Sequence, residues 1–188
     1  NIFSTSKAAK EDLDLIVKFV GQTGIHYHQL SDEMKLNTRV VKRAIVKGVK
    51  VENFPDAVFK EGCEDLCIFM VAKDPSVYTR IVELEANSEV TESPFCNPHS
   101  TDFLDALFSR SSCFNNDVDS FNKYWSIVRS IPSDVIAHNA SERYSNIGNS
   151  MGVTLFMLPL EWAMNKDVFD KLFSDTFHFE RAHRFTSL

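Results

Sequence analysis

Apolar side chains recur at helical spacing along much of this chain. In residues 7–20, one helical face carries Leu13, Ile16, Val17 and Val20. This is the i, i+3, i+4, i+7 spacing of an amphipathic helix. Ser6 is a suitable N-cap for it and Gly21 a suitable stop. We therefore expect the first helix at 7–20.

The same pattern predicts further helices along the chain. They are expected at 28–36, 38–47, 55–62, 66–72, 74–87, 101–109, 117–130, 133–145 and 166–177. For the helix at 38–47, Asn37 or Thr38 is a suitable cap and Gly48 a suitable stop. Residues 49–53 alternate weakly like a strand, and 153–164 reads as a strand interrupted by Pro159 or as the start of a buried helix. A small sheet from 49–53, 66–72 and 153–158 is therefore left open.

Composition supports a mainly α fold. Only six glycines and six prolines occur in 188 residues, which leaves few turn-forming residues for a chain of many short strands. The stretch 87–100 is rich in Ser, Asn, Pro and Glu, and is the best candidate for a linker. It would separate an amino-terminal helical unit, 1–86, from a carboxy-terminal helical domain, 101–188. A single domain of this length is the alternative.

The net charge of −6 is unevenly distributed. Residues 1–60 hold 10 basic and 7 acidic side chains (+3), and residues 61–188 hold 10 and 19 (−9). No apolar run approaches the ~18 residues that a membrane span needs, so no membrane partner is expected. The four cysteines form no dense framework, and the amino terminus has neither the basic start nor the apolar stretch of a signal peptide. We expect an acidic intracellular, cytoplasmic protein with reduced thiols and no cofactor.

Residues 30–45, LSDEMKLNTRVVKRAI, resemble the helix-turn-helix motif of DNA-binding regulators. In that pattern Leu30 and Met34 are the apolar positions of the first helix, with the small Ser31 after Leu30. The turn and the second helix are represented by Leu36 in the turn, Asn37 as cap, and Val41 and Ile45 packing inward. Lys35 stands where the family usually has glycine, a residue that accepts a left-handed backbone.

A basic stripe lies on the second helix of this segment. When residues 38–50 are wound at 100° per residue, the five basic side chains gather within an arc of roughly 140° and the apolar ones occupy the other side. No acidic residue occurs between 34 and 51, so phosphates would meet uncompensated positive charge. The predicted nucleic-acid-binding residues are Thr38, Arg39, Lys42, Arg43, Lys47 and Lys50. The resemblance implies that the first three read bases and that the others contact the DNA backbone.

An internal echo favours a different role. Leu30 to Met34, followed by Val40 and Val41, resembles Phe54 to Val58, followed by Leu66 and Cys67, at an offset of 24 to 26 residues. Such spacing suits tandem helical hairpins. The hypotheses are therefore a non-enzymatic regulator that binds double-stranded DNA through helix 38–50, and a helical-hairpin interaction or structural protein whose basic stripe docks an acidic protein surface. In the first case the acidic remainder would serve self-association, such as a homodimer, or a protein partner.

Two further patterns resemble chemical sites, one a nucleophilic serine and the other a zinc site. Gly148-Asn-Ser150-Met-Gly152 matches the G-x-S-x-G nucleophile elbow of serine hydrolases. The residues before it lack the character of a buried strand, which favours an ordinary turn and a non-enzymatic protein. Cys63, Cys67, Cys96 and His99 are a weak candidate set for tetrahedral zinc, because the spacing of the first pair is unusual and Cys67 lies in an apolar run. We expect no metal.

Overall fold

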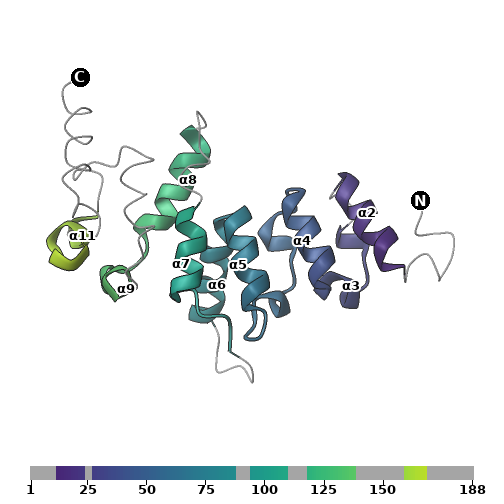
Figure 1. The fold of residues 1–188 in the computed structure, drawn as a ribbon, viewed down its shortest axis with the longest axis horizontal. Helices are drawn as coiled ribbons and strands as arrows, with labels where there is room; N and C mark the ends of the chain where they lie inside the picture. Colours follow the sequence, from purple (N-terminus) through teal and green to yellow (C-terminus); the bar gives the residue numbers. More distant parts are fainter. Residues whose placement is uncertain (1–11, 24–26, 88–93, 110–117, 139–158, 169–188) are drawn as a thin grey trace. The chain divides into compact units, whose positions relative to one another are not determined.

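The structure is a computed structural model, and it describes residues 12–23, 27–87, 94–109, 118–138 and 159–168 (Figure 1). Of these residues, 76% are helical and none lies in a named strand, which confirms the mainly α fold. Contacts divide the chain into two units, 1–96 and 97–188. The division falls within the stretch 87–100, but whether each half folds alone stays a prediction.

The first unit consists of short helices in sequence. Its α-helices are α2 (Leu13–Thr23), α3 (Asp32–Leu36), α4 (Thr38–Val46), α5 (Glu64–Lys73) and α6 (Ser76–Asn87). Three 3₁₀ turns join them, η2 (Tyr27–Gln29), η3 (Val51–Asn53) and η4 (Asp56–Phe59). Helix α4 packs against α2 and α5, and α5 in turn packs against α6.

The structure corrects several expected boundaries. Helix α2 continues through Gly21 to Thr23, so Gly21 is not a stop. Residues 51–53 form a 3₁₀ turn and 66–72 are part of α5, so neither contributes to a sheet. The weak alternation at 49–53 does not reflect a strand. The amide of Val49 bonds to the end of α4, and Val51 is buried within the 3₁₀ turn. Residues 153–158 of the possible sheet lie outside the described residues.

Other helix ends are as expected. Asn37 caps the start of α4, and Gly48, with φ of 79°, lies just beyond the end of the helix. The amides of Gly48 and Val49 donate to the carbonyls of Ile45 and Ala44, at 3.1 Å in both cases. This doubly bonded helix end places its glycine in the left-handed region, where a side chain would be strained.

The same burial pattern recurs in three helices of the first unit, α2, α4 and α5. Helix α4 buries Val40, Val41, Ala44 and Ile45, and α5 buries the residues 26 positions later, Leu66, Cys67, Met70 and Val71. In α2, the residues 24 positions before the α4 set include Ile16, Val20 and Gly21, all buried, with Val17 half-buried. The 3₁₀ turn η4 before α5 likewise starts 24 residues after α3.

The second unit is also helical. It contains α7 (Thr101–Phe108), α8 (Val118–Arg129), α9 (Ser133–His138) and α11 (Leu160–Met164). Its described core consists mainly of aromatic and aliphatic side chains of α7 and α8, together with Trp162. The indole N–H of Trp162 donates to the carbonyl of Ile131 at 2.9 Å, which ties α11 to the turn after α8. Every described helix is too short or too polar to cross a membrane.

Candidate functional site

The junction between α3 and α4 is a single residue, Asn37. Its amide donates to the carbonyl of Met34 at 3.2 Å, and its side-chain oxygen accepts from the amide of Arg39 at 3.0 Å. Asn37 therefore ends one helix and caps the next, as short polar side chains do. Helix-turn-helix units usually join their helices by three or four residues, so this junction is tighter than the resemblance implies.

The apolar positions of the resembling segment are only partly buried. Leu30, Val41 and Ile45 are buried, as the resemblance requires. Leu36, expected in the turn, is instead the last residue of α3 and is 43% exposed. Lys35 lies within α3, so its position needs no left-handed residue. The helix-turn-helix assignment stays a prediction.

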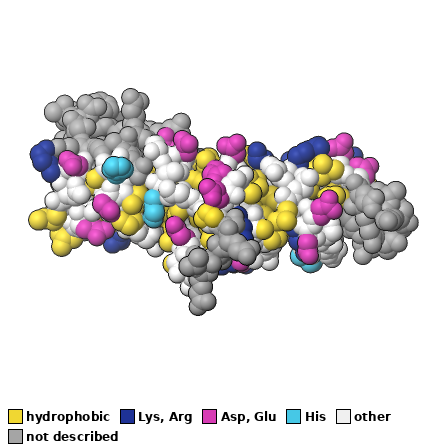
Figure 2. All heavy atoms as spheres, turned by 90° about the horizontal axis from the view of Figure 1, so that it is seen from below, with side chains coloured by type: hydrophobic (Ala, Val, Ile, Leu, Met, Phe, Trp, Pro, Cys, Tyr) yellow, Lys and Arg dark blue, Asp and Glu magenta, His cyan; other side chains and the backbone are white. Residues whose placement is uncertain are grey.

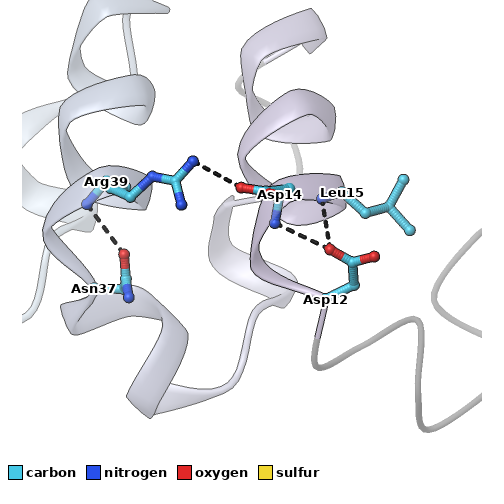
Figure 3. Close-up of polar contacts among 5 residues, drawn as sticks. All are labelled: Asp12, Asp14, Leu15, Asn37 and Arg39. Atoms are coloured by element: carbon cyan, nitrogen blue, oxygen red, sulfur yellow. Dashed lines mark hydrogen bonds and ion pairs between the residues drawn. The ribbon is translucent and has the colours of Figure 1, made fainter.

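Arg39 faces a carboxylate of another helix. Its guanidinium lies 2.7 Å from a carboxylate oxygen of Asp14 on α2 (Figure 3). Both side chains are exposed, so the pair stabilises the fold by less than about 1 kcal/mol. The pairing nevertheless places negative charge beside a residue predicted to read bases.

Lys42 lies over an aromatic ring. Its Nζ is 5.2 Å from the ring centroid of Phe69 on α5, and the Nζ of Lys73 is 5.6 Å from the same centroid. Phe69 is half-buried. A cation over a ring face is attracted by its negative charge density, so this contact holds the side chain of Lys42 toward α5.

Arg43 extends in the opposite direction, onto α2. A Cβ added at Gly21 would lie 2.3 Å from its Nε, so the guanidinium lies directly against the backbone at this glycine. The remaining two predicted residues, Lys47 and Lys50, are exposed, and Thr38 is exposed at the start of α4. The helix expected to run through residue 50 ends at Val46, so Lys47 and Lys50 follow α4 rather than lie on it. The side chains of Arg39, Lys42 and Arg43, which do lie on α4, point to different neighbours.

The basic stripe is also interrupted by an apolar side chain. At 100° per residue, Val46 lies about 20° from Arg39 around the α4 axis, within the arc of the basic residues. It is 48% exposed. The expectation of an uninterrupted basic face is therefore wrong. On the face drawn in Figure 2, acidic and basic side chains are likewise interspersed with apolar ones.

A depression of about 580 Å³ lies between the first turns of α4 and α5. Its walls carry both charges, with Lys42 opposite Glu64 and Asp65, and apolar groups from several residues. The lining residues are Leu36, Thr38, Lys42, Ala57, Val58, Gly62, Cys63, Glu64, Asp65 and Leu66. This grouping could not be predicted from local sequence patterns, because two 3₁₀ turns separate α4 from α5.

Glu64 is held as a carboxylate at this depression. The amide of Gly62 donates to its Oε1 at 2.9 Å, and this hydrogen bond is the main reason that the pKa of Glu64 is lowered. Gly62 has φ of 91°, which turns the chain into α5. The negative charge at this wall is therefore built into the start of the helix.

The cysteines of the weak zinc set are only partly brought together. The sulfurs of Cys67 and Cys96 are 3.7 Å apart, and Cys63 lies one turn before Cys67 at the start of α5. His99 belongs to the second unit. Among the described residues, no three His, Cys, Asp or Glu side chains are arranged to hold a metal ion.

The serine motif lies outside the described residues. The motif consists of Gly148, Ser150 and Gly152 with the residues between them, and the structure therefore does not bear on the hydrolase hypothesis.

The second unit has a depression of its own, again of about 580 Å³. It is lined by Asn122, Trp125, Ser126, Arg129, Ser130 and Pro159.

Comparisons with protein-family models, with curated proteins and with solved structures find no match to this chain.

Proposed function

We propose that the first unit is a helical-repeat scaffold that binds another protein. The observation that carries the proposal is the burial pattern shared by α2, α4 and α5 at spacings of 24 and 26 residues. Arrays of repeated helices bury one face of each unit against the next, and they use the remaining continuous surface to bind partners.

The surface around α4 suits a segment that is both acidic and apolar. Lys42 offers a positive charge at the depression, while Leu36 and Val46 offer exposed apolar side chains nearby on α3 and α4. Protein interfaces combine apolar contacts with a polar rim in this way. The carboxylates of Glu64 and Asp65 would then position the segment by repelling its acidic groups from one wall.

Duplex DNA is the second candidate. It is favoured by Arg43, Lys47 and Lys50, which add positive charge along and beyond α4 with no acidic residue in the intervening sequence. It is disfavoured at the other end of the helix. There, Asp14 pairs with Arg39, and Glu64 and Asp65 line the depression that Thr38 and Lys42 share. Carboxylates at these positions would repel phosphates.

A displayed library of random peptides, selected on the intact chain, tests the first proposal. We expect selected peptides to combine Asp or Glu with apolar residues, and their affinity to fall at least about tenfold, or 1.4 kcal/mol, in Lys42→Glu. Lys123→Glu is the matched control, because Lys123 is an exposed lysine of α8 in the second unit. It should leave binding unchanged.

Charge-reversal variants also decide between a protein partner and duplex DNA. A random duplex of about 20 base pairs should not bind the chain at about 50 mM salt. Duplex binding that weakens as salt rises, and that is lost on charge reversal at Arg39 and Lys42, would replace the protein partner by DNA. Peptides that bind equally well to Lys42→Glu would reject the proposed surface. Light scattering would show whether a second copy of the chain is the partner.

A further inference from the structure

Two buried cysteines of the first unit lie side by side, and the proposed partner binding leaves them unused. Cys67 projects from the buried face of α5, and Cys96 comes from a segment 29 residues later. Both side chains are almost fully buried, at 0% and 1% exposure. Their sulfurs are 3.7 Å apart, and both are free thiols.

Backbone hydrogen bonds hold the Cys96 segment against the chain that leads into α5. The amide of Cys96 donates to the carbonyl of Phe59, and the amide of Glu61 donates to the carbonyl of Pro94, each at 2.9 Å. Between them, Lys60 and Phe95 form an antiparallel bridge. The position of Cys96 is therefore set by backbone contacts of Cys96 and of the two residues before it.

Each thiol is also oriented by a carbonyl oxygen. The sulfur of Cys96 lies 3.0 Å from the carbonyl oxygen of Lys60, and the sulfur of Cys67 lies 3.2 Å from that of Val58. A disulfide requires sulfurs at about 2.05 Å. Closing the remaining distance takes a small movement of two side chains that already face each other.

We propose that Cys67 and Cys96 are a reversible redox pair, which closes to a disulfide when a hydroperoxide reaches it and reopens with a thiol reductant. This proposal is independent of partner binding, since it rests on the sulfur geometry alone. Because both sulfurs are buried, the oxidant must be small, and hydrogen peroxide is the member of its class closest to water in size.

The two thiols have unequal roles. The hydrogen bond between the two sulfurs lowers the pKa of Cys96 against the opposing effect of burial, and nearby backbone amides act in the same direction. The same hydrogen bond, together with burial, raises the pKa of Cys67. Cys96 is therefore the thiol of the pair that ionises more readily, and the thiolate is the form that reacts with peroxides.

The reaction balances in two steps. The thiolate of Cys96 attacks one peroxide oxygen, the O–O bond breaks, and Cys96 becomes a sulfenic acid while hydroxide leaves. The sulfur of Cys67 then attacks the sulfur of Cys96, and its proton leaves with the sulfenic hydroxyl as water. The proton that Cys96 releases when it ionises converts the hydroxide to water, so two thiols are oxidised and one hydrogen peroxide is reduced to two waters. In the reverse direction, two molecules of a thiol reductant regenerate both cysteines and become a disulfide.

Peptide mapping of the intact chain after hydrogen peroxide treatment tests the proposal. The four cysteines should fall to two titratable thiols, with one cross-linked peptide that contains Cys67 and Cys96. Dithiothreitol should restore all four. The oxidised chain should unfold at a higher denaturant concentration than the reduced chain, because the new bond closes a loop of the unfolded chain.

Cys63→Ser is the matched control, since Cys63 is a half-buried thiol one helical turn from Cys67. This variant should still form the pair, whereas Cys96→Ser should not. A disulfide that involves Cys63 or Cys113, four unchanged thiols, or sulfinic acid without a disulfide would each overturn the proposal. Because the mapping is made on the unaltered chain, it does not depend on the folding of any variant.

Discussion

Tyr27 joins two structural roles in one side chain. Its hydroxyl donates to the carbonyl of Lys35 at 2.6 Å, and its ring packs against Phe54 with centroids 4.9 Å apart. The last carbonyls of a helix have no partner within the helix, so this hydroxyl satisfies one at the end of α3. Burial raises the pKa of Tyr27 well above its ordinary value of 10.0.

We expect Tyr27→Phe to lower the free energy of unfolding by about 1 kcal/mol near neutral pH, because one hydrogen bond is lost. The raised pKa predicts a second effect. Above about pH 10 the unfolded state ionises before the folded state, so the unaltered chain loses stability as the pH rises further. The variant should lose less of its free energy of unfolding over the same rise in pH. Tyr78, whose pKa burial also raises, keeps part of the alkaline effect in both proteins.

Urea unfolding of both proteins at about pH 8 and about pH 11 measures the two effects. An equal loss of stability between the two pH values in the variant and in the unaltered chain would contradict the assignment to Tyr27.

At the scale of elements, α4 is the helix on which the first unit depends. It packs against both α2 and α5, and Val40, Val41 and Ala44 are fully buried. The opposite side of the same helix carries Val46, which is 48% exposed. One nine-residue helix therefore offers two valines in contrasting environments.

Val41→Ala should destabilise the chain by about 2 kcal/mol, because two buried methyl groups are replaced by a cavity. Val46→Ala, on the same helix, should change stability by less than about 0.5 kcal/mol. Both substitutions replace valine by alanine in α4, so the difference between them mainly measures the burial of Val41. Chemical denaturation of the two variants checks this, and similar losses in both would contradict the packing of α4.

At the scale of the whole molecule, the structure assigns the end of the first unit to Cys96. The hydrogen bonds of residues 94–96 with Phe59 and Glu61 bring this segment back to the chain before α5. A boundary at residue 86, as expected from the onset of the polar stretch, would cut these contacts. The composition of 87–100 could not reveal them, because a polar loop can return to the unit that it leaves.

We expect a fragment of residues 1–96 to unfold cooperatively and to be about 2 kcal/mol more stable than a fragment of residues 1–86, which lacks both backbone hydrogen bonds and the buried Cys96. Circular dichroism during urea unfolding measures the difference. Equal stability of the two fragments would show that residues 87–96 do not belong to the first unit.

The sequence by itself determined which residues of α4 turn inward. Val41 and Ile45 were expected to pack back, and both are buried, because helical periodicity places residues three and four apart on one face whatever surrounds the helix. Caps and stops followed for the same local reason at Asn37 and Gly48. At Gly21 this local reasoning was wrong, since α2 packs against α4 and continues through Gly21 to Thr23.

Only the tertiary structure decided which side chains far apart in the sequence come into contact. Arg39 meets Asp14 from 25 residues earlier, Lys42 meets the ring of Phe69 on α5, and Cys96 meets Cys67 from 29 residues earlier. A local sequence pattern carries no information on such pairs, because they depend on which helices stack and at what offset. The sequence therefore determined a basic and an apolar side of α4, and the packing of α2 and α5 decided that the basic side is bordered by carboxylates and an aromatic ring.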